Sequence, residues 1–180
     1  MQQRVIIIGS GFAGLWAAIS AARLRHMLEK TEQLEIVLVS KQDYHGIRPR
    51  YYEADLSAVK VDLAPILQQV NVRLLVATVL DIDSHNNNIA TDKTIMHYDR
   101  LLLAAGSQLN VPNISGAKEY SFNVDSYDAA TTLQQHYQPL HDEQTAVVIG
   151  GGFTGLEVAT ELAAKFTKVV IIDSKKTGYG

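Results

Sequence analysis

Residues 5–22, VIIIGSGFAGLWAAISAA, decide the fold of this chain. Val5–Ile8 is a β-branched block, Gly9-Ser10-Gly11 interrupts it, and the residues from Phe12 onward favour a helix. The stretch is uncharged and long enough to span a membrane or to serve as a signal peptide. We reject both interpretations because two glycines within three residues suit a tight turn between a strand and a helix.

The spacing Gly9-x-Gly11-x-x-Gly14 at this turn predicts a nucleotide-binding loop. Gly9 permits the turn, Gly11 lets the backbone approach a pyrophosphate, and Gly14 lets the helix pack closely on the strand. The helix N-terminus then offers free N–H groups and a positive dipole end to the phosphates. The alternative is a glycine-rich turn without a ligand. A second strand at Glu35–Val39 follows the helix, which favours nucleotide binding.

The same unit occurs twice. Residues 5–22 align without gaps on residues 146–163, AVVIGGGFTGLEVATELA, with eight of eighteen positions identical. The second glycine motif consists of Gly150, Gly152 and Gly155, and Lys168–Ile172 is the expected strand after its helix. A repeat at this separation is too long for a solenoid and indicates two copies of one nucleotide-binding unit.

The fold class follows from the apolar strands that alternate with helices, which predict a buried parallel sheet. Residues 72–82 and 88–98 resemble two strands around a turn, and residues 100–104 a further buried strand. We therefore expect an α/β fold: a Rossmann-like parallel sheet with an inserted antiparallel β-meander, followed by the first βαβ unit of a second Rossmann-like domain. The expected domains are 1–110, a linker and helix over 111–143 (helix about 126–137), and 144–180.

The residues that end the second strand of each copy bear on cofactor choice. An acidic residue there normally binds the ribose hydroxyls, but the first copy has Ser40 followed by Lys41. Ser40 either hydrogen-bonds a ribose or is an ordinary polar strand end. Asp173 in the second copy would accept from a 2′-OH and repel a 2′-phosphate, which favours NADH. Glu157, expected in the first turn of the second helix, either contacts the nicotinamide or favours the helix N-terminus electrostatically.

Composition excludes several classes of function. The 180 residues carry a net charge of −3, which offers no electrostatic footprint for nucleic acid. No cysteine is present, so thiolate zinc sites, disulfides and a catalytic thiol from these residues are excluded. The six histidines lack metal-ligand spacing, and no metal site is expected. We expect Phe12, Trp16 and Phe153 to lie in the core.

The stretch YDRLLLAAGS at residues 98–107, between the two glycine motifs, carries a family resemblance. The pattern resembles the two-dinucleotide-binding FAD/NAD(P)H flavoprotein oxidoreductases with the pyridine nucleotide-disulfide oxidoreductase fold. In that family an Ala-Thr-Gly turn ends the strand, and Ala105 replaces its threonine here. Residues 37–45 and 48–53 look most like type II NADH dehydrogenases. The absence of cysteine counts against the disulfide-reducing and sulfide:quinone branches.

The resemblance implies that FAD and NADH are bound and that hydride passes from NADH to FAD and on to a quinone or another small acceptor. The residues implied for FAD are Gly9, Ser10, Gly11, Phe12, Ala13, Gly14, Ser40, Lys41, Arg48, Val79, Ala104, Ala105 and Gly106. Those implied for NADH are Gly150, Gly152, Gly155, Glu157 and Asp173. No catalytic side chain is assigned. The alternative function is a non-catalytic nucleotide-binding or interaction module.

Length gives a further expectation. Only 25 residues follow Gly155, which complete one strand–helix–strand unit, whereas a dinucleotide domain needs two such halves. We therefore expect the N-terminal part of a longer oxidoreductase, inactive or weakly active alone. Strand 168–173 would lack its usual neighbours, so we expect self-association. The expected location is cytoplasmic, with the full-length protein peripheral at the inner membrane.

Overall fold

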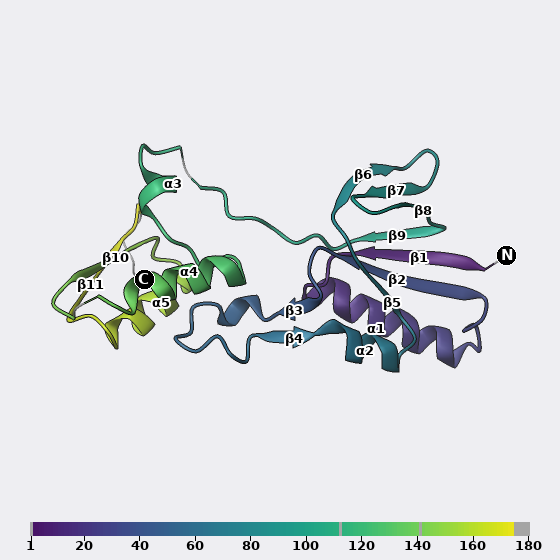
Figure 1. Ribbon diagram of the computed structural model, residues 1–180, viewed down its shortest axis with the longest axis horizontal. Helices are drawn as coiled ribbons and strands as arrows, with labels where there is room; N and C mark the ends of the chain where they lie inside the picture. Colours follow the sequence, from purple (N-terminus) through teal and green to yellow (C-terminus); the bar gives the residue numbers. More distant parts are fainter. Residues whose placement is uncertain (1, 112, 141, 175–180) are drawn as a thin grey trace. The chain divides into compact units, whose positions relative to one another are not determined.

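The computed structural model describes residues 2–111, 113–140 and 142–174. The chain forms two compact units (Figure 1). Unit 1 contains the residues up to Ile47 and Lys60–Gln108, and unit 2 contains Arg48–Val59 and the residues from Leu109 onward. The sequence predicts a domain boundary near residue 110, which would keep Arg48–Val59 in the first domain. In the structure this segment belongs to unit 2 instead.

Unit 1 is built on a four-stranded parallel sheet. Its strands lie in the order β5 (Arg73–Val76), β2 (Leu34–Ser40), β1 (Gln3–Ile8), β9 (Arg100–Leu103). The chain thus builds outward from β1 to β2 and β5, and then returns to place β9 on the other side of β1. This is the order of a Rossmann-like half-sheet, as predicted.

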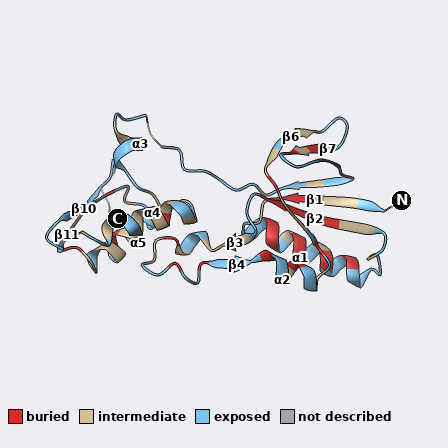
Figure 2. Cartoon of the chain, viewed as in Figure 1, coloured by how far each residue is buried: buried red, intermediate tan, exposed pale blue. Residues whose placement is uncertain are grey.

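Both faces of this sheet are covered along β1 and β2, which explains why Val5–Ile8 and Ile36–Val39 are apolar. The edge strand β9, which the sequence predicts to be buried, instead exposes Leu102 and Leu103. Ile7 of β1 packs with Leu15, Leu38 and Leu63 in one core, which joins the sheet to the helices α1 (Phe12–Met27) and α2 (Leu63–Gln69). Successive side chains of a strand point to opposite faces, so the neighbouring residues of β1 and β2 form a second core. That core contains Ile6, Ile8, Val37, Val39, Ala77, Ile89, Met96 and Tyr98. Buried residues accordingly line α1, β1 and β2 in Figure 2.

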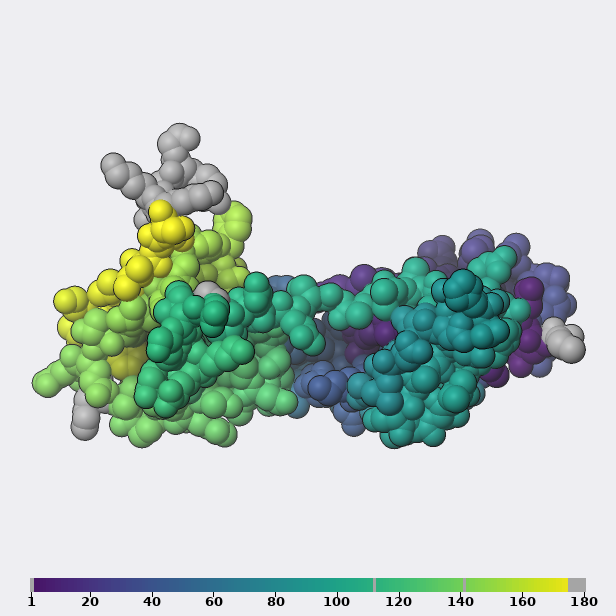
Figure 3. Space-filling model, turned by 90° about the horizontal axis from the view of Figure 1, so that it is seen from above, coloured from purple at the N-terminus to yellow at the C-terminus, as the bar shows by residue number. Residues whose placement is uncertain are grey.

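The second core lies beneath a three-stranded antiparallel meander, as predicted. Its strands are β6 (Val79–Asp83), β7 (Asn88–Thr91) and β8 (Ile95–His97). In Figure 3 their teal residues lie in front of the purple N-terminal strands. The expected boundaries were wrong, because residues 72–82 divide between β5 of the parallel sheet and β6 of the meander.

Local hydrogen bonds explain why the two expected strands, residues 72–82 and 88–98, are each divided. The Ala77 N–H donates to the Ser40 carbonyl at 2.8 Å, where β5 leaves the parallel sheet. The hydroxyl of Thr91 accepts from the N–H groups of Lys93 and Thr94, which closes a turn between β7 and β8. Residues 88–98 therefore form two short strands instead of the single strand expected.

Several short elements are not predicted by the sequence. These are the antiparallel pair β3 (Tyr44–Gly46) and β4 (Lys60–Asp62), the 3₁₀ helix at Arg48–Arg50, helix α2, and α3 (Ala117–Tyr120) within the expected linker. Pro65 lies in the first turn of α2, where the missing N–H removes no helical hydrogen bond. Short strands of three residues carry too little alternation to be recognised from the sequence.

Unit 2 contains the second copy of the repeat. Its elements are α4 (Tyr127–Tyr137), β10 (Thr145–Ile149), α5 (Phe153–Ala163) and β11 (Lys168–Ile172), with β10 and β11 parallel. Ser126 caps α4 by accepting from the Ala129 N–H, so this helix begins where the sequence predicts. The strand expected at 168–172 is confirmed residue for residue.

Segment Arg48–Val59 is held within unit 2 by α4 and α5. The side-chain amide of Gln134 donates to the carbonyls of Glu53 and Ala54, at 2.8 and 2.9 Å. The Ala54 N–H donates to the Glu161 carboxylate at 3.3 Å. Apolar residues add to these contacts: Tyr51, Leu56 and Val59 are buried, and the Tyr51 ring meets that of Tyr127 edge-on. The segment is therefore an integral part of unit 2.

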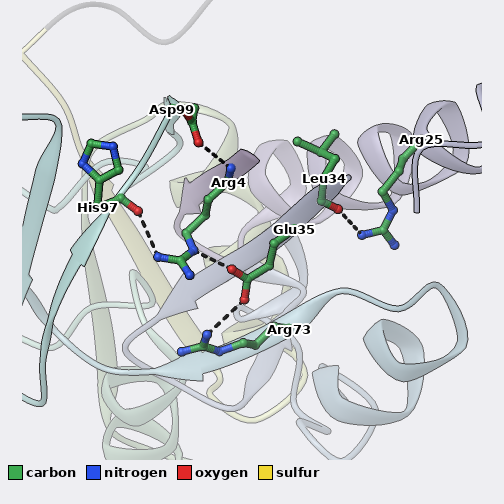
Figure 4. Close-up of polar contacts among 7 residues, drawn as sticks. All are labelled: Arg4, Arg25, Leu34, Glu35, Arg73, His97 and Asp99. Atoms are coloured by element: carbon green, nitrogen blue, oxygen red, sulfur yellow. Dashed lines mark hydrogen bonds and ion pairs between the residues drawn. The ribbon is translucent and has the colours of Figure 1, made fainter. Parts of the chain in front are cut away.

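The amino end of the parallel sheet is held by charged groups (Figure 4). Glu35 of β2 pairs with Arg4 of β1 at 2.5 Å and with Arg73 of β5 at 3.0 Å, so one carboxylate joins three strands. Arg25 of α1 is buried, and its guanidinium donates to the carbonyls of Leu34, Val70 and Asn71. These contacts fix the strand register at the amino end of the sheet. The loops that follow β1 and β9 lie at its carboxyl end.

The aromatic residues expected in the core are exposed, and that expectation was wrong. Phe12, Trp16 and Phe153 are 47%, 63% and 74% exposed. Helix α1 is apolar around most of its circumference, so its sequence does not reveal which face packs on the sheet. Within residues 2–111, 113–140 and 142–174, no helix combines the length and apolarity needed to cross a membrane, and no cluster of three potential metal ligands is found.

Candidate functional site

The two loops expected to bind FAD meet at the carboxyl end of the parallel sheet in unit 1. β1 ends at Ile8 and β9 at Leu103, and these two strands are neighbours. The chain order reverses here, since β2 lies on the other side of β1, and ligands of open α/β sheets bind at such a point. A Cβ atom on Gly9 would lie 2.2 Å from the Ala104 carbonyl oxygen, so the two loops are in direct contact.

The three glycines of the first motif play three distinct parts. Gly9 has φ of +104°, a conformation that other residues rarely adopt. A Cβ on Gly14 would lie 1.8 Å from the Gly9 carbonyl oxygen, so Gly14 permits the close contact of helix and loop. A Cβ on Gly11 would meet no atom within 4 Å. Close packing within the protein therefore explains why positions 9 and 14 are glycines. The open space at Gly11 would instead allow a ligand to approach the backbone.

The helix end beside Gly11 suits an anion. Gly11 is the N-cap residue of α1, no side chain caps this helix, and its first turn contains no acidic residue. The N–H groups of the first turn lack partners inside a helix, and the helix dipole is positive here. The open space at Gly11 and these donors together fit the pyrophosphate of a dinucleotide such as FAD.

Side chains from β2 and β3 hold the residue between the first two glycines. The hydroxyls of Ser10 and Ser40 lie 2.7 Å apart, and the Gln42 N–H donates to the Ser40 hydroxyl at 3.2 Å. The Nδ1 atom of His45 lies 2.8 Å from the Ser10 carbonyl oxygen. Both Ser40 and His45 are buried. Ser10 is thus tied through its side chain and its backbone, a connection between distant residues that no sequence motif signals.

A cavity of about 530 Å³ opens beside this loop. Its walls are formed by Ile8, Gly9, Val39, Ser40, Lys41, Ala77, Thr78, Val79, Leu80, Asp81, Ile82, Leu103 and Ala105. Five of the residues predicted for FAD are among them: Gly9, Ser40, Lys41, Val79 and Ala105. The volume is typical of a small-molecule site, and its apolar floor suits a flat aromatic ring.

The sequence does not predict the part of the cavity formed by Thr78 and Leu80–Ile82. These residues belong to a segment for which the sequence predicts one continuous strand. The pairing of β6 with β7 shifts register between Val79 and Asp81, and Leu80 is 68% exposed. A register shift of this kind bends the strand and turns residues away from the sheet. No signal in the sequence predicts the irregularity.

The remaining residues predicted for FAD lie in two places. Phe12 and Ala13 are exposed in the first turn of α1, and the Ala104 N–H donates to the Ile8 carbonyl at the start of the second loop, where Gly106 has φ of +74°. Arg48, by contrast, lies in the segment that packs with unit 2, where its guanidinium pairs with Asp125. A contact between Arg48 and FAD stays a prediction.

The glycine loop of unit 2 repeats the first one. Gly150 has φ of +108°, and a Cβ on Gly155 would lie 1.9 Å from the Gly150 carbonyl oxygen. A Cβ on Gly152 would again meet nothing within 4 Å. The two copies of the motif therefore share the open space at the second glycine and the close packing at the third. They differ at the first glycine, because a Cβ on Gly150 would meet nothing within 4 Å, whereas one on Gly9 would meet Ala104.

Strand pairing identifies the residue that corresponds to Ser40. The Gly9 N–H donates to the Val39 carbonyl and the Gly150 N–H to the Ile172 carbonyl, both at 2.8 Å. Asp173, the next residue, thus occupies in unit 2 the place of Ser40 in unit 1. Its carboxylate accepts from the Gly151 N–H at 2.5 Å. An acidic group stands beside the second loop, where the first has a neutral hydroxyl.

The sequence predicts Glu157 in the first turn of the second helix, and this prediction is wrong. Helix α5 begins at Phe153 and has no acidic residue in its first turn, so Glu157 belongs to the second turn. The proposed electrostatic effect on the helix N-terminus falls off within the first turn and is therefore not supported. Glu157 is exposed, and its contact with nicotinamide stays a prediction.

Comparisons with known proteins agree with this geometry. The family model of the pyridine nucleotide-disulphide oxidoreductases matches residues 3–177. An NADH dehydrogenase-like protein of Mycobacterium tuberculosis is 42% identical over 170 residues, which cover 90% of this chain and 42% of the relative. A type II NADH:quinone oxidoreductase of Staphylococcus saprophyticus is 27% identical over 184 residues, which cover 93% of this chain and 45% of the relative.

A solved structure also superposes on most of this chain. The sulfide:quinone oxidoreductase of Aquifex aeolicus superposes with a TM-score of 0.79 at 26% identity, covering 96% of this chain and 43% of that one. The chain thus spans less than half the length of these relatives. Its doubled glycine loops and the match over residues 3–177 place it in one family: the chain belongs to the pyridine nucleotide-disulphide oxidoreductases.

Proposed function

We propose that this chain is part of an FAD-dependent oxidoreductase that transfers hydride from NADH to FAD and on to a quinone or another small acceptor. The observation that carries the proposal is the pair of glycine loops with the same backbone geometry and different strand-end residues. Two similar loops suit two dinucleotides, and the acidic Asp173 beside the second loop, where the first has Ser40, supports NADH in unit 2 and FAD in unit 1.

Unit 1 would hold FAD. Gly9, Gly11 and Gly14 shape the loop, and the N–H groups of Gly11 and the first turn of α1 bind the pyrophosphate. The cavity beside Ser40 and Lys41 takes the adenosine, with the Val79 backbone next to the adenine. Because the Ser40 hydroxyl is already bonded to Ser10 and Gln42, the ammonium group of Lys41 is the better candidate to meet the cofactor. The turn Ala104–Gly106 lies against the phosphates or the ribityl chain.

Unit 2 would bind NADH. Gly150, Gly152 and Gly155 repeat the phosphate-binding loop, and Glu157 reaches toward the nicotinamide end. The Asp173 carboxylate accepts hydrogen bonds from ribose hydroxyls, whereas it repels the extra phosphate of NADPH. Bound FAD supplies the redox chemistry by accepting hydride, and the chain supplies position and electrostatics. We propose residues 1–110 as the FAD domain, 111–143 as the connection and 144–180 as the NADH-binding part, with Arg48–Val59 packing on unit 2 although it lies within the first range.

The acceptor and the surroundings belong to the same proposal. Two relatives are named quinone oxidoreductases, which supports a quinone as the acceptor. We propose a cytoplasmic location, peripheral at the inner membrane for the whole protein, and self-association through the edge of β11. Gel filtration coupled to light scattering tests the last point, and a clean monomer would contradict it.

The deciding experiment is FAD uptake by the purified 180-residue chain. We expect flavin absorbance bands that remain with the protein after gel filtration, with slow or no bleaching of those bands by NADH, because the chain spans less than half the length of its relatives. Bleaching by NADH would support hydride transfer over the alternative of a non-catalytic nucleotide-binding module. A chain that takes up no FAD would overturn the proposal for unit 1.

A further inference from the structure

His45 lies beside the first glycine loop but does not belong to the glycine motif. It is 6% exposed, on strand β3, where it pairs with Val61 of β4. Its Nδ1 atom lies 2.8 Å from the Ser10 carbonyl oxygen. A carbonyl oxygen only accepts hydrogen bonds, so Nδ1 carries the proton and donates. The imidazole is therefore bonded to the backbone of the loop.

The same ring also touches the other side of the loop. The Phe12 ring meets His45 edge-on, with 4.7 Å between centroids and an interplanar angle of 88°. Phe12 is the first residue of α1. His45 thus contacts the residues before and after Gly11, while the place of a Cβ at Gly11 itself is open.

Because the peptide bond is rigid, a hydrogen bond to the Ser10 carbonyl also affects the direction of the next N–H group. The Ser10–Gly11 peptide is planar and trans, so the Ser10 carbonyl and the Gly11 N–H point in opposite directions. A donor that fixes the carbonyl on one side also fixes the N–H on the other. Gly11 is the residue at which a ligand pyrophosphate would approach the backbone.

We propose that His45 is a positioning residue: by holding the Ser10 carbonyl, its Nδ1–H aims the Gly11 N–H at the pyrophosphate of the bound dinucleotide. This inference rests on the proposed binding of FAD in unit 1. Without the donor the peptide is free to rotate, so the N–H group must be ordered when the ligand binds, which weakens binding.

Two substitutions separate the hydrogen bond from the bulk of the ring. His45→Asn places an amide nitrogen at the position of Nδ1 and keeps the donor, whereas His45→Leu keeps the volume and removes it. We expect His45→Leu to weaken FAD binding about 10- to 100-fold, because the half-buried Ser10 carbonyl loses its partner and the Gly11 N–H is no longer held in place. His45→Asn should restore affinity to within about threefold of the wild type. The exposed His85→Leu is the control and should change nothing.

The measurements are FAD titration by flavin fluorescence and the ¹H–¹⁵N resonance of Gly11 in the ligand-free chain. We expect the Gly11 resonance to shift in His45→Leu and to return in His45→Asn. Equal FAD affinity in wild type and His45→Leu would overturn the role of His45, as would equal weakening in both variants. If the wild type binds no FAD, the proposed function fails, and an unmoved Gly11 resonance in His45→Leu overturns this inference separately. If His45→Leu does not fold, His45→Gln, which displaces the amide by one carbon, takes its place.

Discussion

The hydroxyl oxygens of Ser10 and Ser40 lie 2.7 Å apart, which ties the first glycine loop to the end of β2. In unit 2 the corresponding residues are Gly151 and Asp173, and there the carboxylate accepts directly from the backbone. In both units the residue at the strand end supports the loop, with a neutral group in one and a charged group in the other. The two copies of the motif therefore differ in electrostatics while they keep one backbone form.

Gly11 and Gly14 should respond differently to the same substitution. Gly11→Val points its side chain into open space, so we expect a folded protein that no longer takes up FAD. Gly14→Val would force a Cβ to within 1.8 Å of the Gly9 carbonyl oxygen, so we expect loss of the fold itself. Circular dichroism and flavin absorbance distinguish the two outcomes. A Gly11→Val protein that retains FAD would refute the site assignment.

Asp173 should decide between the two nicotinamide cofactors. Replacing it by serine removes the negative charge beside the second loop, so we expect NADH to bind roughly 10-fold more weakly and the preference over NADPH to shrink. Titrations with NADH and NADPH measure both effects. The exposed Glu143→Gln serves as a control with the same change in charge. An unchanged ratio of the two affinities would count against a role for Asp173.

Arg25 should be important for stability. Its guanidinium satisfies the carbonyls of Leu34, Val70 and Asn71 from a buried position. Lysine offers a single ammonium group in place of the planar fork, so Arg25→Lys should lower the free energy of unfolding by about 2–4 kcal/mol. Urea unfolding measures this loss, with the exposed Arg23→Lys as the matched control. Equal stability of the two variants would contradict the structural role.

Glu35 should make stability depend on pH. Burial raises the pKa of its carboxyl group, but hydrogen bonds and charge from Arg4 and Arg73 outweigh burial and hold the pKa below its ordinary value of 4.5. A lowered pKa contributes stability above pH 4.5, and this contribution disappears as the pH falls through the folded-state pKa.

At pH 7 the free energy of unfolding of Glu35→Gln should therefore be lower than that of the wild type by on the order of 1 kcal/mol. On acidification it should fall less than that of the wild type. Unfolding at pH 7 and at more acidic pH values provides the comparison, and Glu32→Gln, which alters an exposed carboxylate, is the control. The prediction fails if wild type and Glu35→Gln lose the same stability between these pH values.

Much of the architecture could be predicted from the sequence because its signals are local. The glycine spacing and the adjoining apolar runs predicted the strand–helix–strand units, and α1 begins at Phe12 as expected. The positions of Ser40 and Asp173 at the strand ends follow from the same alignment. In each case neighbouring residues determine the conformation, so no knowledge of distant contacts is needed.

The rest depends on contacts between residues far apart in the chain. The hydrogen bond from His45 to Ser10 spans 35 residues, and the bonds from Gln134 to the segment near Ala54 span about 80. The short strand β3 forms because it pairs with β4, and the residues of either strand alone do not predict this pairing. The exposure of Trp16 was also unpredictable, because an apolar helix does not reveal which of its faces will be covered.

Segment Arg48–Val59 belongs to unit 2 although both of its chain neighbours belong to unit 1. The polypeptide therefore passes between the units three times, after Ile47, Val59 and Gln108. A gene cut at any one of these points divides at least one unit, and a piece ending at Gln108 would carry the buried residues Tyr51, Leu56 and Val59 without the rest of unit 2. The two units are interleaved along the chain, so recombination at a single point cannot exchange one unit without also dividing the other.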